Sequence, residues 1–437
     1  MDELVYVYVG LGGAPQFCGR LWARARKGQE SASFEYDEGW LRAANRFSLE
    51  PALSLGPGSF HTGQGKALFG AIGDSAPDRW GRMLMGRAER RAAKREKRTA
   101  RTLREIDYLL MVDDEARQGA LRFSKEPGGP FLRPGAADRI PPMVKLPRLL
   151  VAAEHFEGDA ETEEDIRLLL APGSSLGGAR PKASVRSKNG DLLIAKFPHK
   201  TDETNVVLWE ALALRLARKA GIKVPSWTVE KVSRKSVLVL ERFDRLNKRR
   251  IPFLSAMSML GAKDNETHSY LEVVDAIRQH GAGIEADLEE LWRRIVFYIL
   301  ISNTDDHLRN LGFLCAGSEG WRLAPAYDLN PVPVETKPRV LSTNITLDDG
   351  TASLELAFEV ADYFKLSAKR ARAIVGQVGK VVARWDEDFA GLRPSLSDGV
   401  RRRNIGGLVW VQDWVQLEKE KWLRNSGKRH QIGHLDF

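Results

Sequence analysis

The order of two hydrophobic patterns along the 437 residues predicts an α+β fold. Short apolar runs bounded by turn residues, typical of strands, dominate about residues 145–245. Helical periodicity dominates from about residue 252 onward, and a mixed region precedes both. A chain of this length is long for one hydrophobic core and favours two or three packed subdomains. We therefore expect three parts, at residues 1–124, 125–245 and 246–437.

The first part combines a hairpin pattern with helices expected across residues 67–111. It opens with the strand pattern Val5–Val9, followed by a run of glycines at 10–13. This order is similar to a dinucleotide-binding fingerprint, but Pro15 stands where the third glycine belongs and no amphipathic helix follows. We interpret the glycine run as the start of a hairpin. The Pro- and Gly-rich stretch Glu126–Pro130 then predicts a linker or surface loop.

A glycine- and serine-rich stretch, Gly173–Lys182, stands ahead of a strand pattern at 183–185. Backbone amides approach phosphate oxygens closely only where side chains are small, so this stretch is suited to phosphate binding. It lacks the residue order of a Walker A loop. After the turn Asn189-Gly190, a second strand ends at Lys196, where protein kinases place the lysine that holds the α- and β-phosphates of ATP. The alternative is an ordinary solvated lysine.

A helix is predicted next, over about residues 204–220. Glu210 on this helix could form an ion pair with Lys196, as a helix glutamate does in protein kinases. Glu203 is the competing choice for this partner, and a solvated helix glutamate is the alternative for both.

The apolar strand pattern Ser236–Leu240 runs directly into charged residues. Protein kinases use such a strand end as a hinge, where backbone groups form hydrogen bonds with adenine. Glu241, Arg242 and Phe243 would occupy this position. Phe243 could also pack in the core, and the two roles are compatible.

Two polar segments interrupt the helical second half of the chain. An apolar helix pattern at 295–301 leads into Asn303-Thr-Asp-Asp-His-Leu-Arg-Asn310. A hairpin predicted across residues 311–324 separates this segment from Ala326-Tyr-Asp-Leu-Asn-Pro331. Such a hairpin would bring both polar segments to one end of a small sheet.

The spacing of three residues in these segments indicates phosphoryl transfer. Asp305 and Asn310 stand five positions apart, and Asp328 follows Asn310 by eighteen. Protein kinases space a catalytic aspartate, a metal-binding asparagine and a metal-binding aspartate in a similar way. The reaction needs a carboxylate beside the attacking hydroxyl and oxygen ligands that hold magnesium against the phosphates. The alternative for the first segment is a polar turn or helix cap, where Asn and Asp are common.

Taken together, the segments resemble those of a known family, and they occur here in the same order as in that family. They are Ser175–Lys182, Ala195–Phe197, Leu240–Arg245, Asn303–Asn310 and Tyr327–Leu329. The sequence resembles the HipA family of bacterial serine/threonine kinases, many of which are toxins of type II toxin–antitoxin pairs. Phe69–Arg82 and Asp107–Phe123 are similar to that family's N-terminal signatures. The resemblance implies a two-lobed protein-kinase-like fold with an additional N-terminal α+β subdomain and a mostly helical C-terminal lobe.

The resemblance also implies catalytic roles. Asp305 would be the base in transfer from ATP to a protein serine or threonine, and Asn310 and Asp328 would bind Mg²⁺. His307 would support the geometry of the loop, with a purely structural histidine as the alternative. The sequence departs from some family members at Asp306, where they carry glycine.

For the nucleotide, the resemblance implies a larger set of residues. The ATP-binding residues would be Lys196, Glu241, Arg242, Phe243, Ser175, Gly177, Gly178 and Lys182. Ser175 matches a serine that such kinases autophosphorylate, and Ser174 is the alternative. Phosphorylation adds nearly two negative charges to a loop meant to hold phosphate, so it would expel the loop and switch off ATP binding. Arg180-Pro181 ahead of Lys182 is a further departure from some members.

The partners that we expect are implied by the resemblance, and no separate binding motif in the sequence points to them. It implies a cellular protein substrate, with a translation-related protein as one candidate, and a helix-turn-helix antitoxin. The chain itself has no recognisable helix-turn-helix or zinc-finger spacing, so DNA would be reached only indirectly, through the antitoxin. Two alternatives stay open: a small-molecule or lipid kinase of the same fold, and a non-catalytic DNA-binding or repressor scaffold.

The net charge of +9 is concentrated in two basic stretches, which could bind a polyanion or an acidic partner or could simply be solvated. One is a helical face with Arg87, Arg91, Lys94, Arg98 and Arg101; the other is a C-terminal stretch with Lys419, Lys421, Arg424, Lys428 and Arg429.

We expect a cytoplasmic setting, because the sequence shows neither a membrane-spanning segment nor a signal peptide. No apolar run of membrane-spanning length occurs, and the acidic start at Asp2 and Glu3 is unlike a signal peptide. Cys18 and Cys315 fit no metal or redox motif, which is consistent with a reducing compartment.

Overall fold

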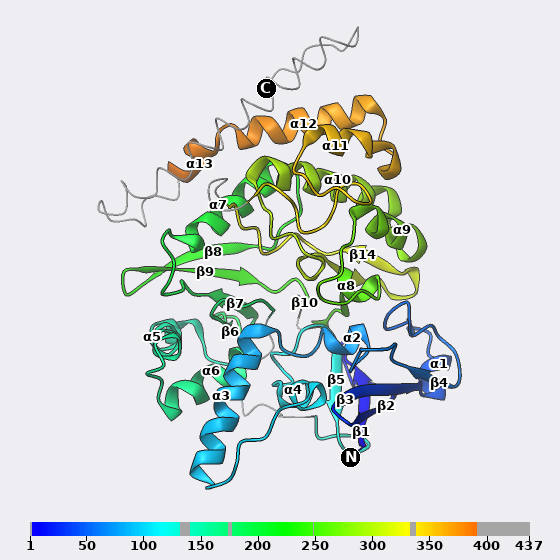
Figure 1. Ribbon diagram of the computed structural model, residues 1–437, viewed down its shortest axis with the longest axis vertical. Helices are drawn as coiled ribbons and strands as arrows, with labels where there is room; N and C mark the ends of the chain where they lie inside the picture. Colours follow the sequence, from blue (N-terminus) through cyan, green and yellow to red (C-terminus); the bar gives the residue numbers. More distant parts are fainter. Residues whose placement is uncertain (1, 132–139, 174–176, 248, 333–337, 391–437) are drawn as a thin grey trace. The chain divides into compact units, whose positions relative to one another are not determined.

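The computed structural model describes residues 2–131, 140–173, 177–247, 249–332 and 338–390 (Figure 1). The chain packs into two compact units. Unit 1 comprises residues 1–202, 226–261 and 314–320, and unit 2 comprises residues 203–225, 262–313 and 321–437. The three-part division expected from the sequence stays a prediction.

A five-stranded antiparallel sheet forms the N-terminal part of unit 1, with the order β4-β3-β2-β1-β5. Its strands are β1 (Glu3–Val9), β2 (Gln16–Arg26), β3 (Gln29–Tyr36), β4 (Ser59–His61) and β5 (Leu121–Ser124). Val5, Val7 and Leu21 are fully buried in its core. Gly12 and Gly13, with φ of 98° and 84°, lie in the connection from β1 to β2, where only glycine adopts this backbone without strain. The hairpin predicted for the glycine run is confirmed.

The helices of unit 1 follow this hairpin in the chain. They are α1 (Glu38–Arg42), α2 (Gly70–Gly73), α3 (Arg79–Arg95), α4 (Glu105–Met111), the short 3₁₀ helix η1 (Met143–Lys145), α5 (Leu146–Glu157), α6 (Glu163–Gly173) and α8 (Ala256–Met259). Helices α2, α3 and α4 confirm the helical character predicted for residues 67–111. Helix α6 packs against both α3 and α5.

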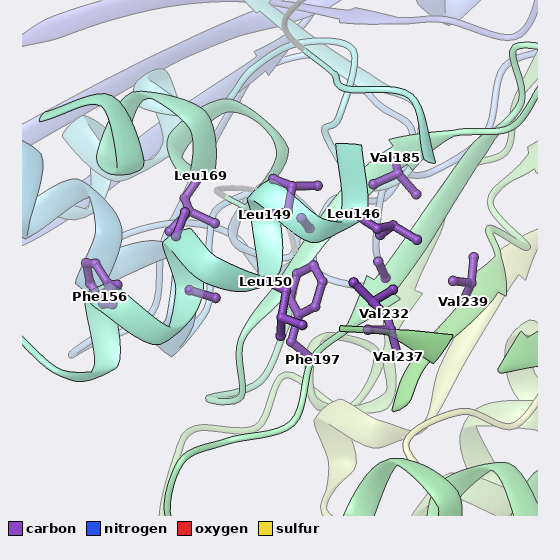
Figure 2. Close-up of a cluster of buried hydrophobic side chains, with 14 of the residues drawn as sticks. Leu146, Leu149, Leu150, Phe156, Leu169, Val185, Phe197, Val232, Val237 and Val239 are labelled. Carbon is purple, nitrogen blue, oxygen red and sulfur yellow. The ribbon is translucent and has the colours of Figure 1, made fainter. Parts of the chain in front are cut away.

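A second antiparallel sheet lies in unit 1, with the order β6-β7-β9-β8. Its strands are β6 (Lys182–Arg186), β7 (Leu192–Lys196), β8 (Trp227–Val232) and β9 (Lys235–Glu241). One hydrophobic cluster joins this sheet to α5 and α6, and Figure 2 shows side chains such as Leu149, Leu150 and Leu169 gathered with Phe197 and Val237. Each fully buried apolar side chain of this size contributes about 1.5–3 kcal/mol. The strands predicted on either side of Asn189-Gly190 and before Glu241 are confirmed.

A buried ionic network connects two distant segments of unit 1. The carboxylate of Asp244 accepts hydrogen bonds from the guanidinium groups of Arg242 and Arg245 and from the backbone N–H of Gly119, at 2.6–2.8 Å. Burial would raise the pKa of Asp244, but the two arginines outweigh this effect and hold the pKa well below its usual value.

Three short strands follow in the chain: β10 (Arg245–Leu246), β11 (Arg249–Arg250) and β12 (Phe253–Ser255).

Unit 2 is mostly helical, as the second-half pattern predicts. Its helices are α7 (Val206–Lys219), α9 (Tyr270–His280), α10 (Ile284–Ile301), η2 (Leu308–Asn310), α11 (Leu354–Glu359), η4 (Ala361–Phe364), α12 (Ala368–Val382) and α13 (Trp385–Ala390). Strand β14 (Trp321–Leu323) belongs to it, and β13 (Gly312–Cys315) is shared by the two units; η3 (Gly317–Glu319) connects these strands as the predicted hairpin.

Helix α10 is the centre of unit 2. Its residues from Asp287 to Ile301 are almost all buried, and it packs against α9, α11 and α12 (Figure 1). The buried Arg294 is neutralised by Glu290 one turn earlier and donates a second hydrogen bond to the carbonyl oxygen of Ala324. Sheets and helices together confirm the α+β prediction. None of the helices in the described ranges is long and apolar enough to cross a membrane.

Replacing Asp244 with Asn should lower the free energy of unfolding by about 3–5 kcal/mol, because two buried guanidinium groups would lose their counter-charge. Urea denaturation followed by fluorescence measures the change. The matched control is Glu38→Ala, which removes the exposed Glu38–Arg42 pair and should cost less than about 1 kcal/mol. An Asp244→Asn variant as stable as this control would contradict the structural importance of the network.

Candidate active site

The loop after α10 begins with a change of backbone conformation. Ser302 ends the helix in the left-handed region, with φ of 52°, and its N–H donates to the carbonyl oxygen of Ile299. The chain then leaves the helix axis. Asn303 follows, and its side-chain oxygen accepts the N–H of Asn330 at 2.9 Å. The two polar segments singled out in the sequence are therefore hydrogen-bonded to each other.

Asp305 and Asn310 are brought together within this loop. The side-chain Nδ2 of Asn310 donates to the backbone oxygen of Asp305 at 2.8 Å. The Asp305 side chain is 48% exposed, so its carboxylate is accessible to a substrate hydroxyl. His307 is similarly half-exposed, and its Nε2 lies 4.0 Å from Oδ1 of Asp305. This distance is the outer limit of an ion pair, and the support of loop geometry expected from His307 stays a prediction.

Asp328 lies on the second segment with an unusual backbone. Its φ of 56° is in the left-handed region, which Asp adopts more readily than most residues but still at some cost. Such backbone outliers concentrate at functional sites. The hydroxyl of Tyr327 donates to the carbonyl oxygen of Arg309 at 2.8 Å, which is a second link between this segment and the loop. Asp328 is thereby held beside the segment that carries Asp305 and Asn310.

The side-chain oxygen atoms of Asn310 and Asp328 are of the kind that binds a magnesium ion. Because Nδ2 of Asn310 is used by Asp305, the other side-chain atom of this amide, Oδ1, is the one available to a cation. Asp328 adds a carboxylate. No group of three or more His, Cys, Asp or Glu side chains suited to a metal occurs in the part of the chain that the structure describes. Magnesium needs no such group, because it commonly binds through one or two protein ligands, substrate phosphates and water.

Asp306 stands out in the sequence only as a departure from some family members, and its role in the loop was not predicted. It is 4% exposed, and its carboxylate accepts the Tyr270 hydroxyl at 2.5 Å and the Ser342 N–H at 2.6 Å. Its backbone oxygen accepts the Thr343 hydroxyl at 2.8 Å. The loop is thus attached to the start of α9 and to the segment at 342–343. No pattern in the sequence distinguishes the buried Asp306 from the exposed Asp305 beside it.

On unit 1, two lysines of the predicted nucleotide site stand opposite each other. Lys182 on β6 and Lys196 on β7 are register partners, so their side chains emerge on the same face of the sheet. Lys182 is buried and its ammonium group donates to the carbonyl oxygen of Gly177. Gly178 has φ of 80°, a conformation that favours glycine. Two adjacent cations on one face are an arrangement suited to phosphate groups.

Ser174 and Ser175, the candidate autophosphorylation sites, lie outside the described residues. Their role stays a prediction.

The predicted hinge begins where β9 ends. Glu241 is exposed, and its N–H donates to the carbonyl oxygen of Ser226 at 2.8 Å. The Arg242 guanidinium is buried and bonds to Asp244 and to two backbone oxygens, so it fixes the segment and is not available to a nucleotide. Any contact of Arg242 with adenine would therefore involve its backbone. Phe243 lies against Phe253, with ring centroids 6.2 Å apart, which supports its core-packing role.

Glu210 is buried in α7 of unit 2, whereas Lys196 belongs to unit 1. The proposed Glu210–Lys196 pairing stays a prediction, and Glu203 is exposed.

The basic helical face is largely neutralised by its own unit. Arg87 and Arg91 form ion pairs with Glu161, and Arg98 forms one with Glu89. The sequence could not reveal these partners, because each lies several turns away or in another part of the chain. Arg101 also pairs, with Asp107 at 3.5 Å. These ion pairs favour a solvated helical face over a surface that binds a polyanion. The basic C-terminal stretch lies outside the described residues.

Asp306 predicts a pH dependence of stability. Burial raises its pKa to about 7 from an ordinary value of 3.8, against the lowering effect of the Tyr270 and Ser342 hydrogen bonds. A raised folded-state pKa means that folding favours the protonated form, so the stabilising contribution is complete below about pH 4 and is lost as the pH rises through 7. In Asp306→Asn the amide imitates the protonated carboxyl group. The variant should lose less thermal stability between pH 5 and pH 8 than the unaltered chain.

Thermal unfolding at pH 5, 6, 7 and 8 measures this difference. Tyr270→Phe is the control, because it keeps the carboxyl group and should keep or steepen the pH dependence. Equal slopes for Asp306→Asn and the unaltered chain would show that Asp306 does not titrate in this range.

Comparison with protein families and curated proteins supports the expected resemblance. Residues 174–385 match the family described as HipA-like C-terminal domain. A Haemophilus influenzae protein described as "Putative kinase" is 28% identical over 171 residues, which cover 34% of this chain and 49% of that protein. The chain thus spans about half the length of the curated relative that it matches.

Comparison with solved structures extends the similarity in fold over nearly the whole chain through a HipA structure. The HipA of Shewanella oneidensis MR-1, solved with HipB and operator DNA, has a TM-score of 0.69 at 15% identity and covers 98% of this chain and 100% of its own. The proinflammatory kinase CtkA of Helicobacter pylori has a TM-score of 0.41 at 17% identity, covering 57% of this chain and 91% of its own.

The loop geometry of unit 2 lies inside the segment that matches the family, and the fold around it is that of a HipA. The resemblance seen in the sequence is therefore confirmed: residues 174–385 match the family described as HipA-like C-terminal domain, and the chain has the α+β fold of the S. oneidensis HipA.

Proposed function

We propose that this protein is an ATP- and magnesium-dependent serine/threonine protein kinase. The observation that carries the proposal is the loop of unit 2, where Asn310 is bonded to Asp305 and the Asp328 segment is bonded to the same loop at two points. This is the set of groups that phosphoryl transfer requires. The kinase description of the H. influenzae relative and the HipA-like family match support it.

Asp305 is the proposed base. The acceptor hydroxyl oxygen forms a bond to the γ-phosphorus of ATP while the bond from that phosphorus to the β,γ-bridging oxygen breaks, and the hydroxyl proton passes to the Asp305 carboxylate. Asn310 and Asp328 would hold magnesium, which when bound offsets the charge of the phosphates. His307, whose Nε2 lies 4.0 Å from Oδ1 of Asp305, would support the geometry of the loop.

Residues of unit 1 would bind the nucleotide. Lys182 and Lys196, on one face of the sheet, would offset the phosphate charge, and the Gly177-Gly178 backbone would allow close approach. Adenine would lie at the backbone of Glu241–Phe243. Glu210 is the proposed partner of Lys196.

Regulation and partners follow from the HipA resemblance. Ser175, or Ser174 beside it, is the proposed autophosphorylation site. A helix-turn-helix antitoxin is the proposed partner, because the S. oneidensis HipA was solved with HipB and operator DNA. A cellular protein is the proposed substrate, and the cytoplasm is the proposed setting.

Phosphate mapping by mass spectrometry tests the proposal. Incubation with ATP and Mg²⁺ should place phosphate on Ser175 or Ser174, and Asp305→Ala, Asp328→Ala and Lys196→Ala should each reduce incorporation by at least about a hundredfold. Asp264→Asn, which removes an exposed partner of Arg309, is the control and should keep activity. An unchanged rate in Asp305→Ala would rule out its role as base.

The same assay separates the alternatives. Labelled ATP offered with cell-lysate proteins and with a panel of small-molecule and lipid acceptors identifies the acceptor class. Transfer only to small molecules or lipids would overturn the protein-kinase assignment. DNA binding by the purified chain without any phosphoryl transfer would favour a scaffold.

A further inference from the structure

The N-terminal signature Phe69–Arg82 has no part in the mechanism above, yet its last residues contact the glycine-rich loop. Asp78 is the N-cap of α3, and its Oδ1 accepts the N–H of Arg79 at 2.8 Å. Its other oxygen, Oδ2, accepts the N–H of Gly178 at 2.7 Å. One carboxylate therefore bridges the first turn of α3 and a loop that lies a hundred residues later in the chain.

Trp80 attaches the same loop at two further points. Its backbone N–H donates to the carbonyl oxygen of Gly178 at 3.0 Å, and its indole Nε1–H donates to the carbonyl oxygen of Lys182 at 2.9 Å. The indole is 1% exposed and meets Phe156 edge-on, with ring centroids 5.2 Å apart. Both backbone hydrogen-bonding groups of Gly178 are thus occupied by the first turn of α3.

The start of the loop is fixed to the same helix by packing. A Cβ added to Gly173 would lie 2.8 Å from Cδ1 of Leu84 and 3.0 Å from Nε1 of Trp80, so a larger residue would have to displace these buried side chains of α3. Positions 173, 178 and 182 all contact residues 78–84. Three described positions of this stretch are therefore attached to α3.

We propose that Asp78 and Trp80 are positioning residues that hold the loop backbone at 177–182 in one conformation, the one that the nucleotide phosphates would meet. The nucleotide part of this inference rests on the proposed function. A glycine-containing loop has many backbone conformations, and fixing one before the nucleotide arrives reduces the entropy cost of binding. The Gly178 N–H would then serve to position the loop, and the charge of the phosphates would be met by lysine side chains.

Two conservative variants separate the positioning role from folding. Asp78→Ser keeps a side-chain cap for α3 but is too short to reach Gly178. Trp80→Phe keeps an aromatic ring against Phe156 but has no donor for Lys182. Arg79→Gln is the matched control, because Arg79 lies in the same turn with an exposed side chain.

Hydrogen–deuterium exchange of peptides covering residues 177–186 measures the attachment of the loop directly. Each variant should exchange about tenfold faster there than the unaltered chain, the change that loss of one hydrogen bond produces, while Arg79→Gln should not differ. In the phosphotransfer assay KM for ATP should rise by a similar factor with little change in kcat.

Unchanged exchange in both variants would overturn the attachment. Faster exchange with an unchanged KM for ATP would overturn the positioning role. If the unaltered chain transfers no phosphate at all, the proposed function fails, and exchange still decides whether Asp78 and Trp80 fix the loop.

Discussion

The buried carboxylate of Asp306 is the constraint on which the loop that carries the proposed base depends. The loop has little regular structure of its own, yet in the proposed mechanism it has to present Asp305 to a substrate in one geometry. Asp306 accepts two hydrogen bonds from α9 and from residue 342, while its neighbours Asp305 and His307 stay half-exposed. Successive side chains of an extended backbone point in opposite directions, so burying one fixes the two beside it outward. A buried acid with a pKa near 7 is the cost of this rigidity.

In unit 1, carboxylates that accept backbone N–H groups likewise hold the segments proposed to bind the nucleotide. The loop at 177–182 is held by Asp78 and Trp80, and the hinge segment is held by the bond from Gly119 to Asp244. In both cases a carboxylate accepts the N–H of a glycine far away in the chain. In the proposed function, the N-terminal α+β region would therefore act as a scaffold for the segments that bind the nucleotide.

The sequence predicted the features that depend on local pattern and spacing. Strands β6, β7 and β9, helix α10 and the hairpin between Asn310 and Asp328 are set by apolar runs and turn residues, and the structure confirms them. The burial of Asp306, the commitment of Arg242 to Asp244 and the pairing of Arg87 with Glu161 could not be predicted. Each depends on a partner brought from another element by tertiary packing, and nothing in the local sequence names that partner.

Nucleotide binding with and without Mg²⁺ tests the central claim most directly. Titration calorimetry with a non-hydrolysable ATP analogue would compare the unaltered chain with Asp328→Asn. If Asn310 and Asp328 hold the metal, Mg²⁺ should tighten binding to the unaltered chain by at least about tenfold and have a much smaller effect on the variant. Binding that is equally tight without the metal, or no binding of the analogue, would contradict the assignment of Asn310 and Asp328 as the metal-holding pair of a kinase.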